Sequence, residues 1–187
     1  MANLKETLDR YAEIRKSDEL KEQLYQYLTE GWYLFPVCWF DESGQCACGY
    51  RDKEGKPHTE NQIGKAPITL HGMKDATTLK IGVDEYLKKY PLAGWAGYFP
   101  HQLILDVDTR HNGYAGLAKL EADIGKLPPT RTHVTGSGGL HIIYRLPEGV
   151  TLRASKLNGY EGIDVKINGY IVLPPSPHVS GGAYHVK

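Results

Sequence analysis

The sequence predicts an α+β fold in which short strands fill most of the second half of the chain. Apolar residues recur at three- and four-residue steps near the N-terminus, whereas after Gly31 they mostly alternate or form short runs. The 21 glycines and 11 prolines indicate many turns between short strands rather than a helical bundle. Helical stretches are interspersed irregularly among the strands, which disfavours a doubly wound sheet.

Composition bounds the class of protein. A chain of 187 residues fits one globular domain with a real core. The 22 Lys and Arg residues balance the 22 Asp and Glu residues, which excludes a polycationic tail. No apolar run approaches the roughly 18 residues that span a bilayer, and the N-terminus lacks the apolar segment of a signal peptide. Three cysteines imply no disulfide framework, so we expect a cytoplasmic protein with no membrane partner.

Residues 1–30 form a predicted N-terminal helical segment. Leu4, Leu8 and Tyr11 lie on one helical stripe, and Leu20 begins a second. Ser17, followed by two acidic residues, predicts a break and a new helix start, and Gly31 predicts the end of the second helix. Residues 31–187 then form the main body.

The body is predicted from alternation and turn signals. Strands are expected at 32–39, 95–99, 102–108, 132–135, 140–146, 163–167 and 170–173, and helices at 84–90 and 114–126. Residues 41–67 are polar and predict a long loop or small hairpin. Asn168-Gly169 is a strong hairpin signal, so the strands on either side of it are expected to pair.

Two carboxylates end the predicted strand at 102–108. Because alternate residues of a strand share a face, Asp106 and Asp108 point the same way. Neighbouring carboxylates repel each other, and a divalent cation with a preference for hard oxygen ligands would relieve that repulsion. The alternative is that the pair merely ends the strand in solvent.

Two further strands strengthen the metal interpretation. Asp164 and Lys166 share the polar face of one strand, and His141 alternates with apolar residues in another. The glycine-rich turn at 136–139 would let backbone N–H groups approach an anion. Three carboxylates can hold two cations about 3.5 to 4 Å apart while His141 and Lys166 hold phosphates, which indicates metal-dependent phosphoryl transfer.

At these residues the sequence resembles the bifunctional DNA primase/polymerase (Prim-Pol) family of the archaeo-eukaryotic primase superfamily. The resemblance runs from about Gly31 to about His185, through the stretches GWYLFPV, GKAP, HGMKDATT, LILDVDTRHNG, LPPTRTHVTGSGGLHIIYRLP and GIDVKINGYIVLPPSPHVSGG. It implies a catalytic core built on an RNA-recognition-motif-like sheet. It also implies DNA replication activity, with primer synthesis and DNA polymerisation on a single-stranded DNA template from NTPs or dNTPs.

The resemblance also implies roles for particular residues. Asp106, Asp108 and Asp164 fall on the family's catalytic carboxylates, which bind two Mg²⁺ or Mn²⁺ ions. The residues expected to bind the nucleotide are Ser137, Gly138, Gly139, His141, Lys166 and Arg110. Many relatives carry Arg at the position of Lys166, and either cation can pair with phosphate. Relatives often continue into a helicase domain, so a helicase domain or protein is an expected partner.

The loop at 41–67 carries candidate zinc ligands. Cys46, Cys48 and His58 could supply three ligands of a tetrahedral Zn²⁺ site, with Cys38 as a potential fourth. Cys38 follows a buried strand pattern, which favours a place in the core. Many relatives have a further His where this chain has Ala66, so the last family ligand is missing. The alternatives are free thiols or a degenerate site.

Three classes of function compete on this sequence. The first is a primase/polymerase; the second is a metal-dependent nuclease that uses the same carboxylates with water as the attacking group. The third is a non-catalytic nucleotide- or DNA-binding module of a replication initiator. Basic residues near the motifs support salt-sensitive contacts to a nucleic-acid backbone; they are Lys65, Lys74, Arg110, Arg131, Arg145 and Arg153.

Overall fold

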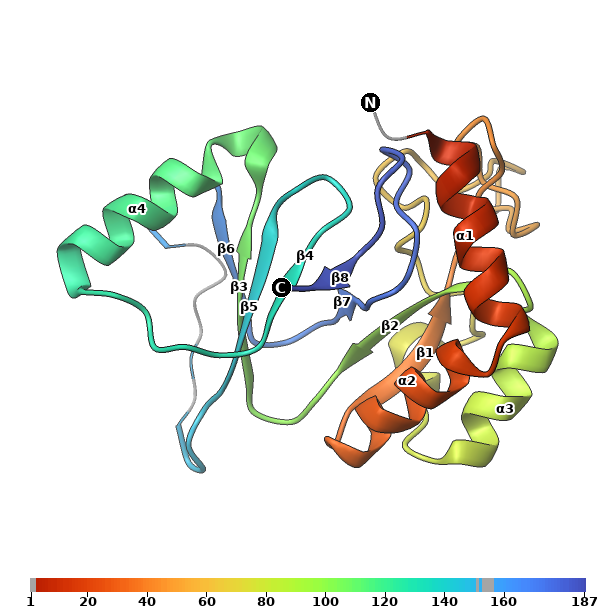
Figure 1. Ribbon diagram of the computed structural model, residues 1–187, viewed down its shortest axis with the longest axis horizontal. Helices are drawn as coiled ribbons and strands as arrows, with labels where there is room; N and C mark the ends of the chain where they lie inside the picture. The colour runs from red at the N-terminus through yellow and green to blue at the C-terminus, as the bar shows by residue number, and fades with distance from the viewer. Residues whose placement is uncertain (1–2, 151, 153–156) are drawn as a thin grey trace.

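A computed structural model describes residues 3–150, 152 and 157–187. The described chain contains two antiparallel sheets that lie side by side, with helices on their outer flanks (Figure 1). The α+β prediction is therefore confirmed. No helix among the described residues is both long and apolar enough to cross a membrane.

The smaller sheet has three strands in the order β1-β2-β7. They are β1 (Tyr33–Val37), β2 (Gly94–Tyr98) and β7 (Ile171–Val172). Three helices flank this sheet, α1 (Leu4–Lys16), α2 (Glu19–Thr29) and α3 (Lys80–Lys89). A short 3₁₀ helix, η1 (Gly72–Asp75), precedes α3. Helix α3 begins before the predicted residue 84, and it includes Gly82, where a side chain would collide with Thr77.

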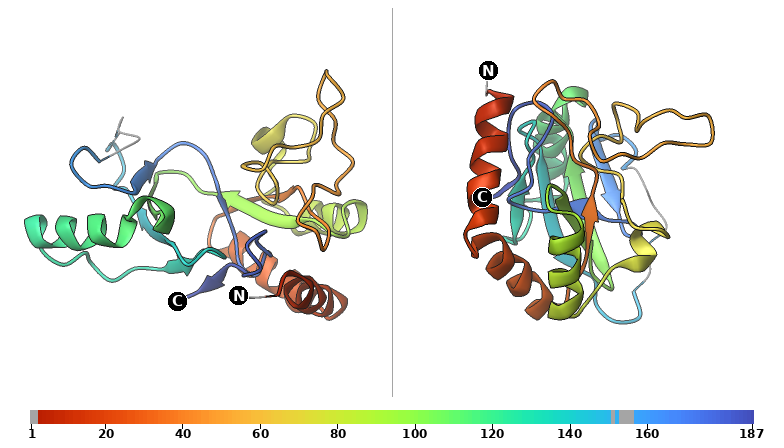
Figure 2. Two further views of the ribbon diagram at one scale, coloured as in Figure 1. Left: turned by 90° about the horizontal axis from the view of Figure 1, so that it is seen from above. Right: turned by 90° about the vertical axis from the view of Figure 1, so that its right-hand side faces the viewer.

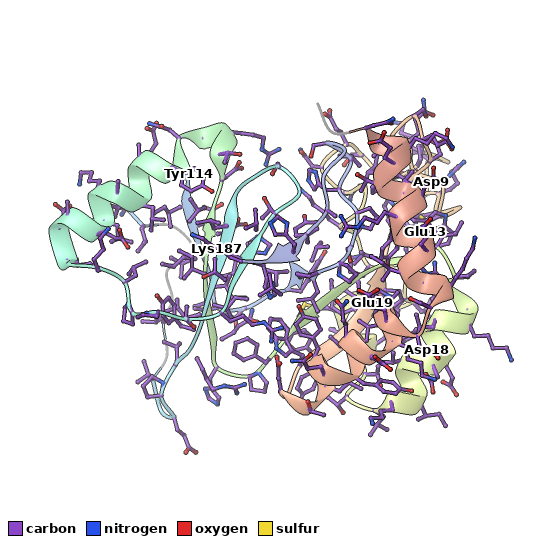
Figure 3. The ribbon with its side chains drawn as sticks, viewed as in Figure 1. Asp9, Glu13, Asp18, Glu19, Tyr114 and Lys187 are labelled. Carbon is purple, nitrogen blue, oxygen red and sulfur yellow. The ribbon has the colours of Figure 1, made fainter. Side chains whose placement is uncertain are left out.

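The N-terminal helices follow the predicted pattern. Asn3 caps α1, because its side chain accepts a hydrogen bond from the backbone N–H of Lys5 at 3.1 Å. The chain breaks around Ser17 as expected, and Gly31 follows α2 with φ +86°. The exposed faces of the two helices carry acidic side chains such as Asp9 and Glu19 (Figure 3).

Apolar faces of these helices join a core that both sheets share. This cluster includes Leu24 of α2, Trp95 of β2, Ile104 of β3 and Ile143 of β5, all at most 5% exposed. The N-terminal helices are thus packed against the same core as the predicted body, which fixes them relative to the sheets.

The larger sheet has five strands in the order β6-β3-β5-β4-β8. They are β3 (Gln102–Val107), β4 (Thr132–Val134), β5 (Leu140–Arg145), β6 (Ile163–Lys166) and β8 (His185–Val186). Helix α4 (Gly113–Ile124) covers one face, where Leu105, Val107 and Leu120 pack in a second core. A 3₁₀ helix, η2 (Thr109–His111), joins β3 to α4.

The predicted hairpin around Asn168-Gly169 is wrong. Strand β6 pairs with β3 in the larger sheet, whereas β7 pairs with β2 in the smaller one. Gly169 does adopt a positive φ of +133°, but the turn carries the chain from one sheet to the other. The Pro100-His101 turn makes the opposite crossing, from β2 to β3.

Gln102 joins these two crossovers. Its buried side chain accepts a hydrogen bond from the Phe99 N–H at 3.2 Å and donates one to the Gly169 carbonyl at 3.0 Å. Because the buried Gln102 side chain bonds to one backbone group of each crossover, it stabilises the junction between the sheets. The open face of the larger sheet, away from α4, meets the smaller sheet at this junction.

Candidate active site

Strand register brings three predicted site residues onto one row of the larger sheet. Asp106 of β3 lies directly opposite His141 of β5 on one side and opposite Asp164 of β6 on the other. Residues opposite each other in antiparallel strands point to the same face. Leu105 and Val107 point to the other face, against α4. The polar row therefore faces the smaller sheet.

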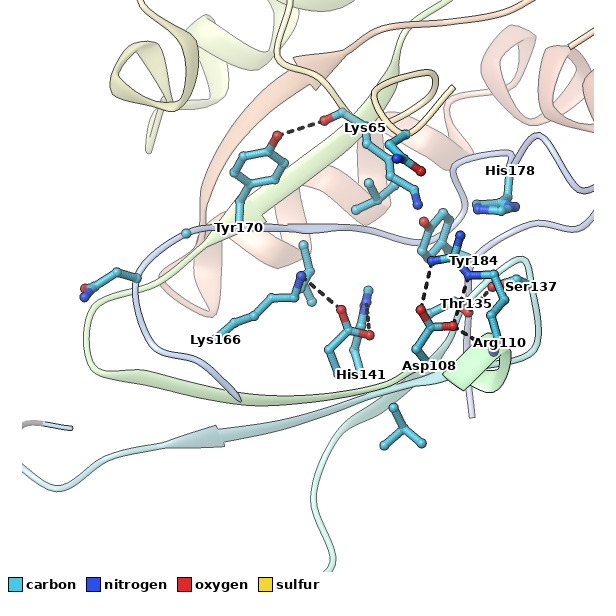
Figure 4. Close-up of a pocket in the computed structure, with 17 residues that line it drawn as sticks. Lys65, Asp108, Arg110, Thr135, Ser137, His141, Lys166, Tyr170, His178 and Tyr184 are labelled. Carbon is cyan, nitrogen blue, oxygen red and sulfur yellow. Dashed lines mark hydrogen bonds and ion pairs between the residues drawn. The ribbon is translucent and has the colours of Figure 1, made fainter. Parts of the chain in front are cut away.

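A cavity of about 430 Å³ opens above this row (Figure 4). Asp106 lines this cavity, Asp108 and His141 lie on its floor, and Lys166 lies at one side. Its walls come from distant parts of the chain, including the loop before η1 and the segment after β7.

Asp106 lies between two basic side chains. Lys166 Nζ is 2.9 Å from Asp106 Oδ2, and His141 Nε2 is 3.7 Å from Asp106 Oδ1. Burial lowers the pKa of His141 to about 4, so the imidazole is neutral at pH 7. The structure thus joins Asp106, His141 and Lys166 in one site, as the sequence predicted.

Asp108 is held by Arg110. The Arg110 side chain donates to both carboxylate oxygens, from Nε at 3.1 Å and Nη2 at 2.8 Å, and its backbone N–H donates at 2.9 Å. His111 Nδ1 lies 3.1 Å from the same carboxylate. The hydrogen bonds from Arg110 hold the pKa of Asp108 well below its usual range, so this carboxylate stays charged.

Asp164 lines a different cavity from Asp106, although the two residues lie directly opposite each other in β6 and β3. Its side chain is exposed and lines a second, adjoining cavity of about 1110 Å³. Asp108 and Arg110 line both cavities, so Asp108 lies where the two cavities adjoin. Among the described residues, the three carboxylates do not form a group whose oxygens all lie within 4.8 Å of one another.

The glycine-rich turn joins β4 to β5 at the edge of the cavity. Ser137 lines the cavity, while Gly138 and Gly139 shape the turn without lining it. Gly138 has φ +87°, and a side chain at Gly139 would collide with the Val107 carbonyl of β3. Glycine at these positions therefore lets Ser137 lie beside the carboxylates.

The C-terminal segment supplies lining residues that the sequence patterns did not single out. Tyr184 stacks on His141 with ring centroids 6.0 Å apart, and His178 meets the edge of Tyr184 at 5.8 Å. Burial lowers the pKa of His178 to about 4. In the sequence, His178 and Tyr184 stand on either side of a glycine turn after β7. That pattern could have drawn attention to them, but the cavity that they line depends on the fold of the whole sheet.

The basic residues noted in the sequence divide into two groups. Lys65 and Arg110 line the cavity. Of the others, Arg145 lies over the Phe99 ring at 4.5 Å, Arg131 pairs with Glu30, and Lys74 is exposed. Arg153 lies outside the described residues.

The cysteines and His58 form a second candidate site. The ligand atoms of Cys38, Cys46, Cys48 and His58 all lie within 4.8 Å of one another. Cys46 Sγ is 3.4 Å from each of the other two sulfurs and from His58 Nδ1. With Zn–S bonds of about 2.3 Å, a tetrahedral site has sulfur–sulfur edges of about 3.8 Å, close to this spacing. We call these four residues the Cys/His cluster.

Cys38 is the fourth member of the Cys/His cluster. It is buried, as expected for a residue that follows β1, yet its thiol points into the cluster. An isolated bridge between Phe40 and Cys46 folds the chain back, and Tyr50 stacks on the His58 ring at 4.2 Å. Figure 2 shows that part of the loop between β1 and η1 projects from the rest of the molecule.

A cavity that two sheets share, lined by carboxylates and by basic side chains, is an arrangement that suits phosphoryl transfer. The model of the family described as bifunctional DNA primase/polymerase, N-terminal (Prim-Pol) matches residues 24–187, and the chain belongs to this family. Membership of this family implies primase/polymerase-type nucleotidyl transfer, with nucleic acid and nucleotides as substrates. The reaction of this family depends on metal ions. No curated protein matches the chain.

Proposed function

We propose that this chain synthesises primers on single-stranded DNA and extends them, transferring nucleotides from NTPs or dNTPs with two divalent cations. The observation that carries the proposal is the position of Asp106, which lies in register with His141 and Asp164 and opens into a cavity shared with Asp108. Family membership supports the reaction class, and this register supports the mechanism.

The carboxylates suit Mg²⁺ or Mn²⁺. Lys166 and Arg110 place positive charge at the oxygens of Asp106 and Asp108, which supports cation binding there. Asp106, Asp108 and Asp164 would hold the two ions through hard oxygen ligands. Such ions activate the attacking hydroxyl and neutralise charge on the phosphates.

The other residues bind and orient the nucleotide. A neutral imidazole has one N–H to donate, and His141 on the cavity floor can give it to a phosphate oxygen. Ser137 can donate its hydroxyl from the edge of the turn, and Lys166 and Arg110 can turn from the carboxylates to the phosphates. Pairing with the template then selects the base.

The two cavities suggest where each substrate lies. Asp106, His141 and Lys166 line only the first cavity, which suits the triphosphate. Asp164 lines only the second, which suits the primer end or first nucleotide that carries the attacking 3′-hydroxyl. Asp108 lines both cavities, so it would lie near the phosphorus atom at which the new bond forms.

A primer-free extension assay tests the proposal. Single-stranded DNA is incubated with NTPs or dNTPs and with Mg²⁺ or Mn²⁺, for the unaltered chain and Asp106→Asn. We expect products that begin with a triphosphate, and no incorporation by the variant. Extension of an added primer alone would reduce the proposal to polymerisation.

Two outcomes would replace the proposal. DNA cleavage without nucleotide incorporation would favour the nuclease. DNA binding that survives Asp108→Ala, with no turnover in either metal, would favour the non-catalytic module.

We also propose that the Cys/His cluster binds one structural Zn²⁺. Three thiol sulfurs and one imidazole nitrogen within 4.8 Å of one another support it, and the neutral form of His58 is favoured because burial lowers its pKa. Such an ion would stiffen a loop that is too polar to fold alone.

A further inference from the structure

Lys65 occupies the wall of the active-site cavity that faces the sheet. It lies in the loop between His58 and η1, and its side chain extends toward Tyr184, on the far side of the cavity from the His141 floor (Figure 4). The charged groups that act on the Lys65 ammonium group are those of Arg110, Asp106, Lys166 and Asp108. Lys65 therefore belongs to the same electrostatic environment as the candidate catalytic carboxylates.

Lys65 differs from the other two cations of the cavity in lacking a carboxylate partner. Lys166 pairs with Asp106 and Arg110 pairs with Asp108. Within the described part of the chain, Lys65 makes no ion pair, although its side chain is half-buried and burial lowers its pKa. Three cations face two carboxylates here, and the excess positive charge favours an anion.

The backbone of Lys65 is held in place from two sides. The Tyr170 hydroxyl donates to the Lys65 carbonyl at 3.1 Å, and the Cys38 N–H donates to the Ala66 carbonyl at 2.8 Å. Gly64 adopts φ +71°, a conformation that favours glycine, and a Cβ there would lie 3.0 Å from the Phe40 ring. These contacts fix the direction in which the Lys65 side chain enters the cavity, so its backbone is a well-anchored part of the cavity wall.

We propose that Lys65 binds the triphosphate of the incoming nucleotide, on the side opposite His141. This inference rests on the proposed function and adds a ligand from the loop that begins at the Cys/His cluster. The ammonium group donates charge-assisted hydrogen bonds to phosphate oxygens. The triphosphate is then held between the sheet and this loop. Its negative charge gives Lys65 the ion-pair partner that the carboxylates of the cavity do not provide.

Equilibrium binding without DNA tests the inference. ATP and adenosine are titrated in Mg²⁺ into the full chain and into Lys65→Met, Lys65→Arg and Lys74→Met. We expect Lys65→Met to weaken ATP binding by about tenfold to a hundredfold and to leave adenosine binding unchanged. Lys65→Arg, which keeps the charge, should stay within a few-fold of the unaltered chain. Lys74→Met removes an exposed lysine outside the cavity and should change nothing.

The outcomes separate this inference from the proposed function. If Lys65→Met binds ATP as tightly as the unaltered chain while Asp106→Asn still abolishes incorporation, the role of Lys65 is wrong and the polymerase proposal stands. Failure of the unaltered chain to bind ATP would overturn both. An equal loss of ATP and adenosine binding, or a loss in Lys65→Arg as large as in Lys65→Met, would show a structural effect and overturn the inference.

Discussion

The two candidate metal sites of this chain are built in opposite ways. In the Cys/His cluster four ligand atoms lie within 4.8 Å of one another, and they come from a short stretch of chain. In the active site the oxygens of Asp106, Asp108 and Asp164 do not all lie within that distance of one another. Asp106 and Asp108 hold basic side chains and face a space of about 430 Å³. A closed set of protein ligands suits a structural ion, whereas an open site leaves room for substrate. The cluster should therefore control stability and the cavity should control turnover.

Asp108→Asn should produce the largest effect, and it should fall on activity. Losing a charge between the two cavities should lower nucleotide incorporation by about a hundredfold to a thousandfold. The ion pair with the exposed Arg110 contributes little to stability, so the unfolding free energy should change by no more than about 1 kcal/mol. Extension rates and urea unfolding measure the two effects. Asp123→Asn on the outer face of α4 is the matched control; a large stability loss in Asp108→Asn alone would break the comparison.

Cys46→Ser should show the reverse pattern. Removing the central thiol should abolish stoichiometric zinc, measured by mass spectrometry of the native protein, and lower the unfolding free energy by more than about 2 kcal/mol. Residues 41–67 should become sensitive to limited proteolysis. Gln45→Ser, at the exposed neighbouring position, should keep both metal and protease resistance. Full metal content in Cys46→Ser would rule out the proposed ligand set.

Gln102→Leu tests whether the junction between the sheets supports the cavity. It would leave the Phe99 N–H and the Gly169 carbonyl without their buried partner, which should cost about 1 to 3 kcal/mol. Because Lys166 precedes this crossover, nucleotide binding should weaken as well. Gln45→Leu, at an exposed position, is the control, and thermal unfolding with ATP titration gives both readouts. Wild-type stability would show that the junction is held by other contacts.

Acidic pH should destabilise the sheet that carries the cavity. Burial lowers the pKa of His133 to about 3, so the unfolded chain takes up a proton below about pH 6.5 that the folded chain does not. His133 should contribute roughly 1.4 kcal/mol to the resulting fall in the unfolding free energy for each pH unit between these values, and the buried His141 and His178 add to it in the same direction. Urea unfolding at pH 7 and pH 5 measures the total slope. His133→Phe should reduce the slope by about 1.4 kcal/mol per pH unit, whereas exposed His185→Gln should not; an unchanged slope in His133→Phe would contradict the assignment.

Local sequence pattern predicted the parts of this fold that depend on neighbouring residues. Alternation placed Asp106 and His141 on polar faces, and turn chemistry placed the β4–β5 hairpin at its glycines. The same turn chemistry located the bend at Gly169 but could not say which strands pair across it, because pairing depends on β2, some 70 residues earlier.

The rest of the site depends on contacts between distant segments. The sequence named Lys65 only as one of several basic residues near the motifs and did not single out His178. Only the packing of the loop and the C-terminal segment around the sheet brings these two residues to the cavity. Cys38 shows the same limit, because its buried strand pattern was correct and yet gave no sign of where its thiol points.

Cys38 follows the last residue of β1, and its backbone N–H is already bonded to Ala66. A ligand to its sulfur would thus be tied directly to the smaller sheet rather than to the projecting loop alone. By mass action, an ion that binds only the folded chain raises the melting temperature in proportion to the logarithm of its free concentration. The whole domain, and not just its loop, would then report how much zinc its surroundings supply.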